Sequence, residues 1–281
     1  MVNFTATLSA LITANHILHY HEVVDAYGHV LVRNPNNDST FFMSGYLAPA
    51  LVSSMEDLIE YYVEDASPVD PNAGRGYSER NIHGEILKRF PSVNSVIHSH
   101  SENVLPYTIS GVSLQLTYHM AGFLGEEVPV FDIAQYYNAS DRHDMLVRNT
   151  RLGAALASYF SSSSDNLSAT DLEPEHTLVL MRSHGFATIG TDIELAVYRA
   201  IYAHSNARVQ TGAIALASQA NSDGQPGAGG LGQVRYLSTR ERTDSRAMNE
   251  GTRNRPWRMW VREVETYPGG LYQNALGTPP T

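Results

Sequence analysis

The sequence predicts an α/β protein in which helices cover one main sheet. Short segments with the apolar pattern of strands alternate along the chain with longer segments whose apolar residues recur at helical spacing. The chain has 281 residues, 42% of them hydrophobic, which is enough for a substantial buried core. Because an apolar sheet face must be covered, this alternation favours helices layered on a sheet.

The first predicted elements are one helix and two strands. Apolar residues recur at roughly helical spacing over residues 5–19, which predicts an amphipathic helix. Alternating apolar residues around positions 30–32 and 41–43 predict two short strands. Residues 34–38, which are rich in Asn and contain Pro and Asp, predict the turn between these strands.

The middle of the chain continues the alternation. A helix is expected from about residue 78 to Arg89, because Pro91 cannot continue it. The next segment, residues 93–98, is a strand candidate that leads directly into a His-Ser-His sequence. Two strands and two helices should follow, the strands at 128–133 and 177–181 and the helices at 142–160 and 192–217.

The C-terminal part of the chain differs in composition. Residues 161–164 are four consecutive serines and predict a solvated loop, while the glycine-rich residues 220–232 predict a flexible connection. We therefore expect a main domain over residues 1–219 and an extension over residues 220–281. The extension carries two tryptophans among basic residues, and we expect it to pack on the core or on a neighbouring subunit.

The charge balance argues against some classes of partner. With 19 basic and 29 acidic residues, and histidine taken as neutral, the net charge is -10, which opposes binding to nucleic acid and to anionic membrane surfaces. An apolar stretch at residues 8–17 has no basic residue before it and is interrupted by polar residues. It therefore predicts neither a signal peptide nor a membrane span, and the expected location is cytoplasmic.

Histidines follow two of the predicted strands. His98 and His100 stand two residues apart at the end of a strand candidate, where alternate side chains share a face, so they can bind one ion. His184 follows another apolar segment and precedes Gly185, which permits a tight turn. The alternative is that these are among the many histidines that only form surface hydrogen bonds.

The residue types also indicate which metals could bind. The chain has no cysteine, so a metal site would use histidine, carboxylate and water. Three neutral imidazoles suit zinc, iron, manganese or cobalt and leave a coordination position for a substrate oxygen. We expect Zn2+, with Mn2+, Fe2+ and Co2+ as alternatives.

A second polar pair lies earlier in the sequence. Glu79 and His83 are four residues apart and therefore share one face of the predicted helix. They are candidates for a functional cluster. The alternative is a solvent-exposed helix face with a weak ion pair to Arg80 or Lys88.

Several of these segments together resemble one known family. Residues 77–100 and 182–185 are similar to the class II aldolase and adducin family, which includes the fuculose-phosphate and ribulose-phosphate aldolases and epimerases. Residues 25–33 resemble the glycine-containing early strand of that family, and residues 44–45 resemble the loop that follows it. The resemblance covers about residues 8–215, which is most of the chain.

The resemblance implies a fold and a set of site residues. The fold is a three-layer α/β/α arrangement around a central, mainly antiparallel sheet, with the catalytic domain over residues 1–219. In the family a glutamate precedes the first ligand histidine by 19 positions, as Glu79 precedes His98 here. His98, His100 and His184 are then the implied metal ligands, and Glu79 is the acid/base or a fourth, displaceable ligand.

The implied chemistry makes or breaks a carbon-carbon bond beside a carbonyl. A divalent cation bound to substrate oxygens acts as a Lewis acid and holds the electrons released by bond cleavage as an enediolate or enolate. A nearby carboxylate can transfer the proton.

The positions that bind phosphate in sugar-phosphate members are changed here. The asparagine that follows the early glycine is His29, and the Ser-Ser pair before the glutamate is Tyr77-Ser78. An imidazole and a phenol would crowd a phosphate pocket, whereas Arg33 or Arg80 could meet a carboxylate. We therefore expect an unphosphorylated substrate. The expected substrate-binding residues are His29, Arg33, Ser44, Gly45, Ser78, Arg80 and His83.

Three segments resemble the decarboxylase-type members of the family in particular. They are residues 28–30, 79–80 and 118–125, and the members they resemble act on hydroxylated aromatic or dienoic carboxylic acids. The resemblance implies decarboxylation of such an acid through a metal-stabilised enolate. Tyr118 and His119 then join the glutamate as catalytic residues, with His119 as an extra acid/base or as a group that orients the substrate carboxylate. As a lone histidine, His119 is equally well explained as a packed structural residue.

Other functions fit parts of the same pattern. A retro-aldol reaction on a hydroxy-carbonyl substrate would use the same electron sink, and a non-haem iron oxygenase could use the same ligands. A catalytically silent, adducin-like interaction domain would lack the ligands, but this sequence retains all three histidines and the glutamate. The resemblance also implies a homotetramer with active sites near subunit boundaries, where Tyr118, His119, Arg255 or Trp257 could act across an interface.

Overall fold

A seven-stranded sheet forms the centre of the fold. The computed structural model describes residues 3–161, 173–222 and 232–281. The strand order is β3-β2-β1-β4-β7-β6-β5, and every neighbouring pair is antiparallel except β5 and β6. The strands are β1 (His29–Arg33), β2 (Thr40–Ser44), β3 (Leu58–Tyr62), β4 (Ser95–Ser99), β5 (Val130–Phe131), β6 (Leu178–Met181) and β7 (Gly185–Gly190). The expected mainly antiparallel sheet is confirmed.

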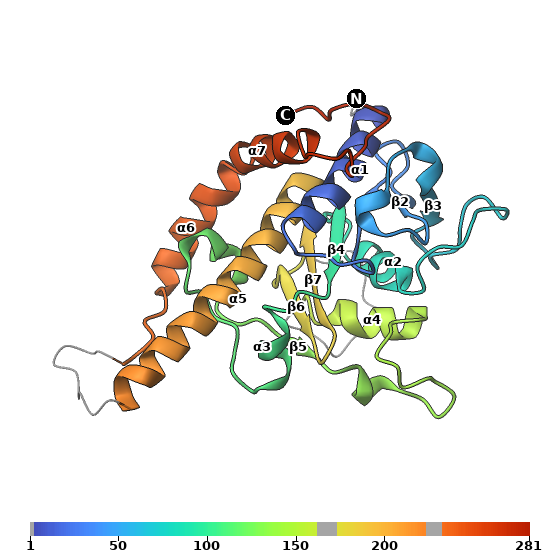
Figure 1. Ribbon diagram of the computed structural model, residues 1–281. Helices are drawn as coiled ribbons and strands as arrows, with labels where there is room; N and C mark the ends of the chain where they lie inside the picture. Colours follow the sequence, from blue (N-terminus) through green and yellow to red (C-terminus); the bar gives the residue numbers. More distant parts are fainter. Residues whose placement is uncertain (1–2, 162–172, 223–231) are drawn as a thin grey trace.

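Helices pack on both faces of this sheet (Figure 1). They are α1 (Phe4–Tyr20), α2 (Arg80–Arg89), α3 (Leu105–Ile109), α4 (Thr150–Ser158), α5 (Ile193–Ser222), α6 (Thr239–Gly251) and α7 (Asn254–Glu265), with short 3-10 turns η1 (Pro49–Leu51), η2 (Met55–Asp57), η3 (His119–Leu124) and η4 (Ile133–Tyr136). One buried cluster joins α1, α5 and α7 to the sheet face that carries Val30 and Ile97. The other joins α2 and α4 to the face that carries Leu31 and Val96. The three-layer α/β/α fold is therefore confirmed.

The helix predicted over residues 142–160 is shorter in the structure. Helix α4 begins at Thr150, because the side chain of Asn149 accepts a hydrogen bond from the amide of Leu152 and so caps the helix. Met145 has a φ of 68°, which a right-handed helix cannot contain. The prediction was wrong over the first part of this segment, where the chain forms an irregular stretch that lies against α2 through Val147.

The C-terminal extension packs on its own chain. Trp257 and Trp260 of α7 are only 1% and 2% exposed and belong to the same buried cluster as residues of α1 and α5. The guanidinium of Arg199 in α5 lies 2.6 Å from the Glu250 carboxylate in α6. A second ion pair, 2.5 Å long, joins Arg253 to Asp192. Residues 162–164 of the predicted serine loop lie outside the described residues, as do residues 223–231 of the predicted flexible connection.

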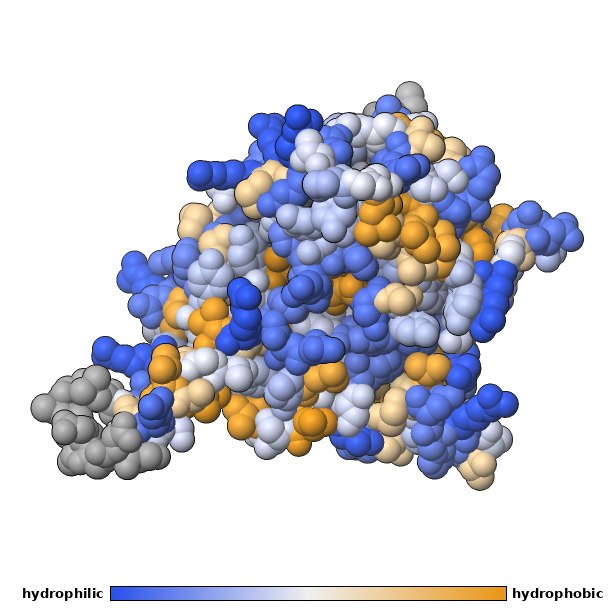
Figure 2. Space-filling view, in the orientation of Figure 1, coloured by the Kyte–Doolittle hydropathy of each residue, from blue (hydrophilic) through white to orange (hydrophobic). Residues whose placement is uncertain are grey.

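The molecular surface mixes polar and apolar residues. Hydrophilic and hydrophobic side chains are interspersed over the face shown in Figure 2. Although α5 is 30 residues long, no helix in the described part of the chain combines the length and the apolar character needed to cross a lipid bilayer.

Candidate metal centre

Two neighbouring strands and one turn bring the three histidines together. His98 lies near the end of β4 and pairs with Ala187 of β7, and His100 follows β4 directly. His184 lies in the turn between β6 and β7, where Ser183 has a φ of 56°. A Cβ atom at Gly185 would lie 1.9 Å from the carbonyl oxygen of Ser99, so only glycine lets this turn approach β4 closely enough.

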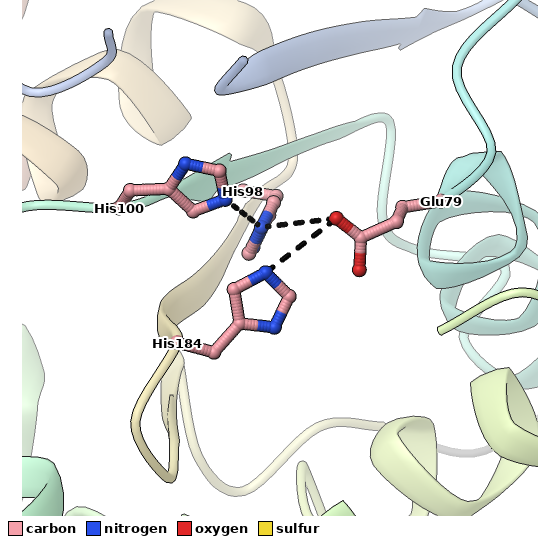
Figure 3. Close-up of side chains that lie close together, drawn as sticks. All are labelled: Glu79, His98, His100 and His184. Carbon is pink, nitrogen blue, oxygen red and sulfur yellow. Dashed lines mark hydrogen bonds and ion pairs between the residues drawn. The ribbon is translucent and has the colours of Figure 1, made fainter. Parts of the chain in front are cut away.

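The four candidate ligands converge on one point (Figure 3). One ligand atom from each of Glu79, His98, His100 and His184 lies within 4.8 Å of all the others. Nε2 of His98 is 3.1 Å from Nε2 of His100 and 3.7 Å from Oε2 of Glu79. Nε2 of His184 is 3.5 Å from the same carboxylate oxygen. Three imidazole nitrogens and one carboxylate oxygen therefore surround a space suited to a single cation.

Contacts on the far side of His98, His100 and Glu79 fix the orientation of these three groups. The Nδ1 of His98 lies 3.1 Å from the carbonyl of Phe186, which can only accept, so Nδ1 carries the hydrogen and Nε2 is left with its lone pair. The Nδ1 of His100 lies 3.3 Å from the carboxylate of Asp25. One oxygen of Glu79 accepts a 3.0 Å hydrogen bond from the amide of Val147. The free lone pairs of these groups consequently face the centre of the cluster.

Burial keeps the innermost ring neutral. His98 is fully buried, and this burial, followed by the neighbouring imidazoles, holds its pKa well below its ordinary value. For Asp25, burial raises the pKa, but hydrogen bonds from the amides of Tyr27 and Gly28 outweigh this, and the pKa is lowered overall. A neutral imidazole at His98 and an ionised carboxylate at Asp25 are the forms that metal binding requires.

The donor set fits a divalent transition metal. Zinc, iron, manganese and cobalt all accept imidazole nitrogen and carboxylate oxygen, and three histidines with one exchangeable position are typical of catalytic zinc sites.

The alternative of a solvent-exposed helix face at Glu79 and His83 is wrong, because these residues are 6% and 0% exposed.

A second imidazole pair lies beside His98. His83 Nε2 is 2.5 Å from His29 Nδ1, and the His29 ring centroid is 5.1 Å from that of His98. Burial lowers the pKa of His83 to about 3. Burial, followed by nearby imidazoles, holds the pKa of His29 well below its ordinary value. Both rings are therefore neutral, and a direct role in binding substrate stays a prediction.

The other predicted substrate-binding residues differ in their exposure and in the bonds they make. Ser44 is buried, and Gly45 forms an isolated bridge with Gly76, whereas Ser78 is exposed beside Glu79. The guanidinium of Arg80 donates to the carbonyls of Ala66 and Tyr77.

Arg33 lies at the end of β1 opposite to His29. Its guanidinium donates to the carbonyls of Val93, Leu87 and Asp38. These bonds hold Arg33 away from the four converging groups. The structure thus places Arg33 outside the cluster, and its role in binding substrate has no support from the geometry.

Tyr118 and His119 lie apart from the cluster within one chain. The amide of Tyr118 donates to Asn206 of α5, and the carbonyl of His119 accepts from Asn249 of α6. The side chain of His119 is exposed. Their catalytic role, like that of the exposed Arg255, would require a second subunit and stays a prediction. Trp257, by contrast, is buried in the core of its own chain and cannot reach across an interface.

The sequence reasoning did not single out two groups that shape this site. Asp25 lies within residues 25–33, which resemble the early strand of the family. Its carboxylate is therefore a sequence signal for a partner of a ligand histidine. The amide of Val147 gives no sequence signal, because it contributes through its backbone from a segment predicted to be helical.

Comparisons with known proteins show which family the chain resembles. The family model for the Class II Aldolase and Adducin N-terminal domain matches residues 9–211. The chain is 48% identical over 263 residues to decarboxylase tropJ of Talaromyces stipitatus, covering 94% of this chain and 95% of that protein. It is also 27% identical over 129 residues to 3,4-dihydroxyphthalate decarboxylase of Arthrobacter keyseri, covering 45% of each.

The fold also matches solved structures. An L-fuculose 1-phosphate aldolase from Glaciozyma antarctica superposes with a TM-score of 0.64 at 19% identity, covering 96% of this chain and 92% of that one. At this identity the likeness concerns the fold alone. Because the family model spans most of the chain and the tropJ protein matches it almost from end to end, the chain belongs to the class II aldolase and adducin family.

Proposed function

We propose that this protein is a divalent-metal-dependent decarboxylase of an unphosphorylated, hydroxylated aromatic or dienoic carboxylic acid. The observation that carries the proposal is the convergence of three imidazoles and Glu79 in a chain 48% identical to a decarboxylase. At the coarser level, membership of the family together with this relative shows that the chain is an enzyme of the lyase type. The partial match to 3,4-dihydroxyphthalate decarboxylase supports the aromatic class of substrate.

In the proposed reaction, the three histidines hold the cation and Glu79 transfers a proton. A cation held by His98, His100 and His184 supplies a Lewis acid that stabilises negative charge on a neighbouring substrate oxygen. When the carboxylate leaves as carbon dioxide, the bonding electrons stay on the substrate, and the carbon that lost the carboxylate must gain one proton. Oε2 of Glu79 faces this space while Oε1 is fixed by the Val147 amide, so Glu79 is the group positioned to deliver that proton.

The proposal includes a metal, an assembly and a location. Zn2+ is the proposed ion, because three imidazoles and an exchangeable fourth position suit it, with Mn2+, Fe2+ and Co2+ as alternatives. We further propose a homotetramer in which Tyr118 and His119 approach the site of a neighbouring subunit, and a cytoplasmic enzyme. These points rest on the family resemblance and on composition.

Product analysis separates the proposed reaction from its alternatives. The purified, Zn2+-loaded protein is incubated with a panel of hydroxylated benzoates and dihydroxyphthalates, and carbon dioxide, aldehyde products and oxygen consumption are measured together. We expect carbon dioxide release in equal amount to substrate loss, without oxygen uptake. Aldehyde release from a hydroxy-carbonyl substrate would instead establish the retro-aldol reaction, and coupled oxygen consumption would establish an oxygenase.

A further inference from the structure

A pocket of about 620 Å³ adjoins the candidate metal centre on the side of His100 and Asp25. Its walls come from the end of α1, the segment after β4, the middle of α5 and the segment that follows α7. This last segment contributes Tyr267 and Tyr272, which lie beyond the residues matched by the family model. Part of the pocket is therefore built from the C-terminal extension and not from the family domain.

The pocket meets the cluster at its most open point. The side chain of His100 is 23% exposed, whereas those of His98 and His184 are 0% and 9% exposed. Nε2 of His100 faces His98, and its Nδ1 faces Asp25, which also lines the pocket. Among the four candidate ligands, His100 is the one that lines the pocket, so the pocket and the cluster meet at this residue.

Three tyrosines form an aromatic wall on one side of the pocket. We call Tyr20, Tyr267 and Tyr272 the tyrosine wall. The ring centroids of Tyr267 and Tyr272 are 4.9 Å apart. The ring centroid of Tyr20 lies 5.9 Å from that of Tyr267 and 6.3 Å from that of Tyr272. A 2.9 Å hydrogen bond between the Tyr272 hydroxyl and Nδ1 of His19 anchors the wall to α1. Because Tyr20 and Tyr267 are 38% and 39% exposed, they retain ring surface that can pack against a planar ligand.

The polar groups of the pocket favour a ligand that carries hydroxyls. Glu22, Asp25 and Glu102 line it, and ionised carboxylates can only accept hydrogen bonds. His204 is already engaged, with Nδ1 2.9 Å from the Ser101 hydroxyl and Nε2 2.8 Å from the Asn103 amide nitrogen. The pocket carboxylates repel a second anionic group on the ligand, and they accept hydrogen bonds from ligand hydroxyls. A ring with hydroxyl donors suits this lining better than a dicarboxylate.

We propose that this pocket holds the ring of a hydroxylated aromatic monocarboxylic acid, and that the tyrosine wall determines specificity for that ring. The inference rests on the proposed function, since it places the rest of a molecule whose oxygens reach the cation. The C-terminal extension therefore contributes to substrate specificity. The ring hydroxyls face Glu22 and Glu102, and the planar face of the ring packs on the tyrosine wall.

Binding of two chelating probes of different size tests this assignment. The variants Tyr267→Ala and Tyr272→Ala are loaded with Zn2+, and dissociation constants for 3,4-dihydroxybenzoate and for glycolate are measured by calorimetry. Glycolate can chelate the cation but has no ring that could pack on the tyrosine wall. Tyr62→Ala is the matched control, because Tyr62 is a 43% exposed tyrosine on β3 that does not line the pocket. Tyr267→Leu and Tyr272→Leu keep the bulk of the side chain if the alanine variants do not fold.

The two probes should respond differently. We expect each pocket variant to bind 3,4-dihydroxybenzoate about tenfold more weakly, with glycolate affinity and zinc content unchanged and with Tyr62→Ala like the wild type. Unchanged affinity for the aromatic acid would overturn the assignment, and so would an equal loss for both probes, which would mean that the tyrosines act through the metal site. Glycolate binding by the wild type reports the metal site independently, so failure of this inference is distinguishable from failure of the proposed function.

Discussion

At the residue scale, three of the four candidate ligands are oriented by contacts made away from the cluster. Nδ1 of His98 is committed to a backbone carbonyl, Nδ1 of His100 faces Asp25, and one oxygen of Glu79 is committed to a backbone amide. Such partners fix the tautomer and the direction of a metal ligand. The residue types and their spacing could be predicted from the sequence, whereas these orienting bonds depend on backbone groups that carry no side-chain signal.

Removing the most buried imidazole should remove the metal. In His98→Ala, one of three nitrogen donors is lost from the centre of the cluster, and we expect zinc affinity to fall by at least about 100-fold. Elemental analysis after dialysis measures this directly. His143→Ala, at an exposed histidine, serves as the control and should keep its zinc. Full zinc content in His98→Ala would show that the ligand assignment is wrong.

Glu79 should be needed for turnover more than for holding the metal. Gln keeps the shape and an oxygen that can accept from the Val147 amide, but it cannot carry the proton. In Glu79→Gln we expect kcat to fall by about 10² to 10⁴ while the three histidines keep most of the zinc. Steady-state kinetics with parallel metal analysis separates the two effects. A variant with wild-type kcat would exclude Glu79 as the proton carrier.

At the element scale, the helices and strands predicted most accurately are those with the clearest local apolar pattern. The first helix, β4 and β6 carry clear apolar patterns, and their observed positions lie within a few residues of the predicted ones. The short α3 and β3 were not predicted, because α3 has only five residues and β3 is an edge strand in which only Ile59 and Tyr61 are buried. The irregular stretch before α4 was missed, because the capping role of Asn149 competes with a helical pattern on both sides of it.

The C-terminal extension should contribute strongly to stability through α7. Trp257 is 1% exposed and packs in the cluster shared with α1 and α5, so truncation would leave a large cavity. For Trp257→Ala we expect unfolding free energy to fall by about 3–5 kcal/mol. Denaturant unfolding followed by circular dichroism measures it. Met259→Ala lies on the same helix at a 52% exposed position and should cost little; equal losses in both variants would contradict the packing described.

At the scale of the whole molecule, the site is assembled from distant parts of the chain. Glu79 immediately precedes α2 on one face of the sheet, while the histidines lie at the ends of two adjacent central strands. Sequence spacing and the family resemblance place these residues in one site. The placement of α2 against the end of β4, and the enclosure of the pocket by Tyr267 and Tyr272, depend on long-range packing that local patterns do not report.

Buried histidine outside the site should make the folded state sensitive to acid. The pKa of His16 is lowered to about 4, chiefly by burial; the bond from Nε2–H to the Val52 carbonyl partly opposes this, and the nearby His19 adds a smaller lowering effect. The unfolded side chain titrates near 6.5, so its contribution to stability is complete above that pH. It is lost as pH falls toward 4, because the unfolded chain then binds the extra proton.

The size of this effect follows from the two pKa values. Between pH 7.5 and pH 4.5 we expect His16 to account for about 2–3 kcal/mol of lost unfolding free energy. Urea unfolding of the wild type and of His16→Gln at both pH values isolates this contribution, since the other histidines are common to both proteins. The same pH dependence in the two proteins would contradict the assigned pKa.

The central claim is that one divalent cation, held by His98, His100 and His184, is required for release of carbon dioxide. The most direct test removes the metal with a chelator and then titrates Zn2+ back while carbon dioxide release from a hydroxylated aromatic acid is recorded. We expect no turnover without metal, and recovery that rises linearly until one ion is bound per chain. Turnover that persists in fully metal-free protein, or that does not return when the ion is bound, would contradict the account.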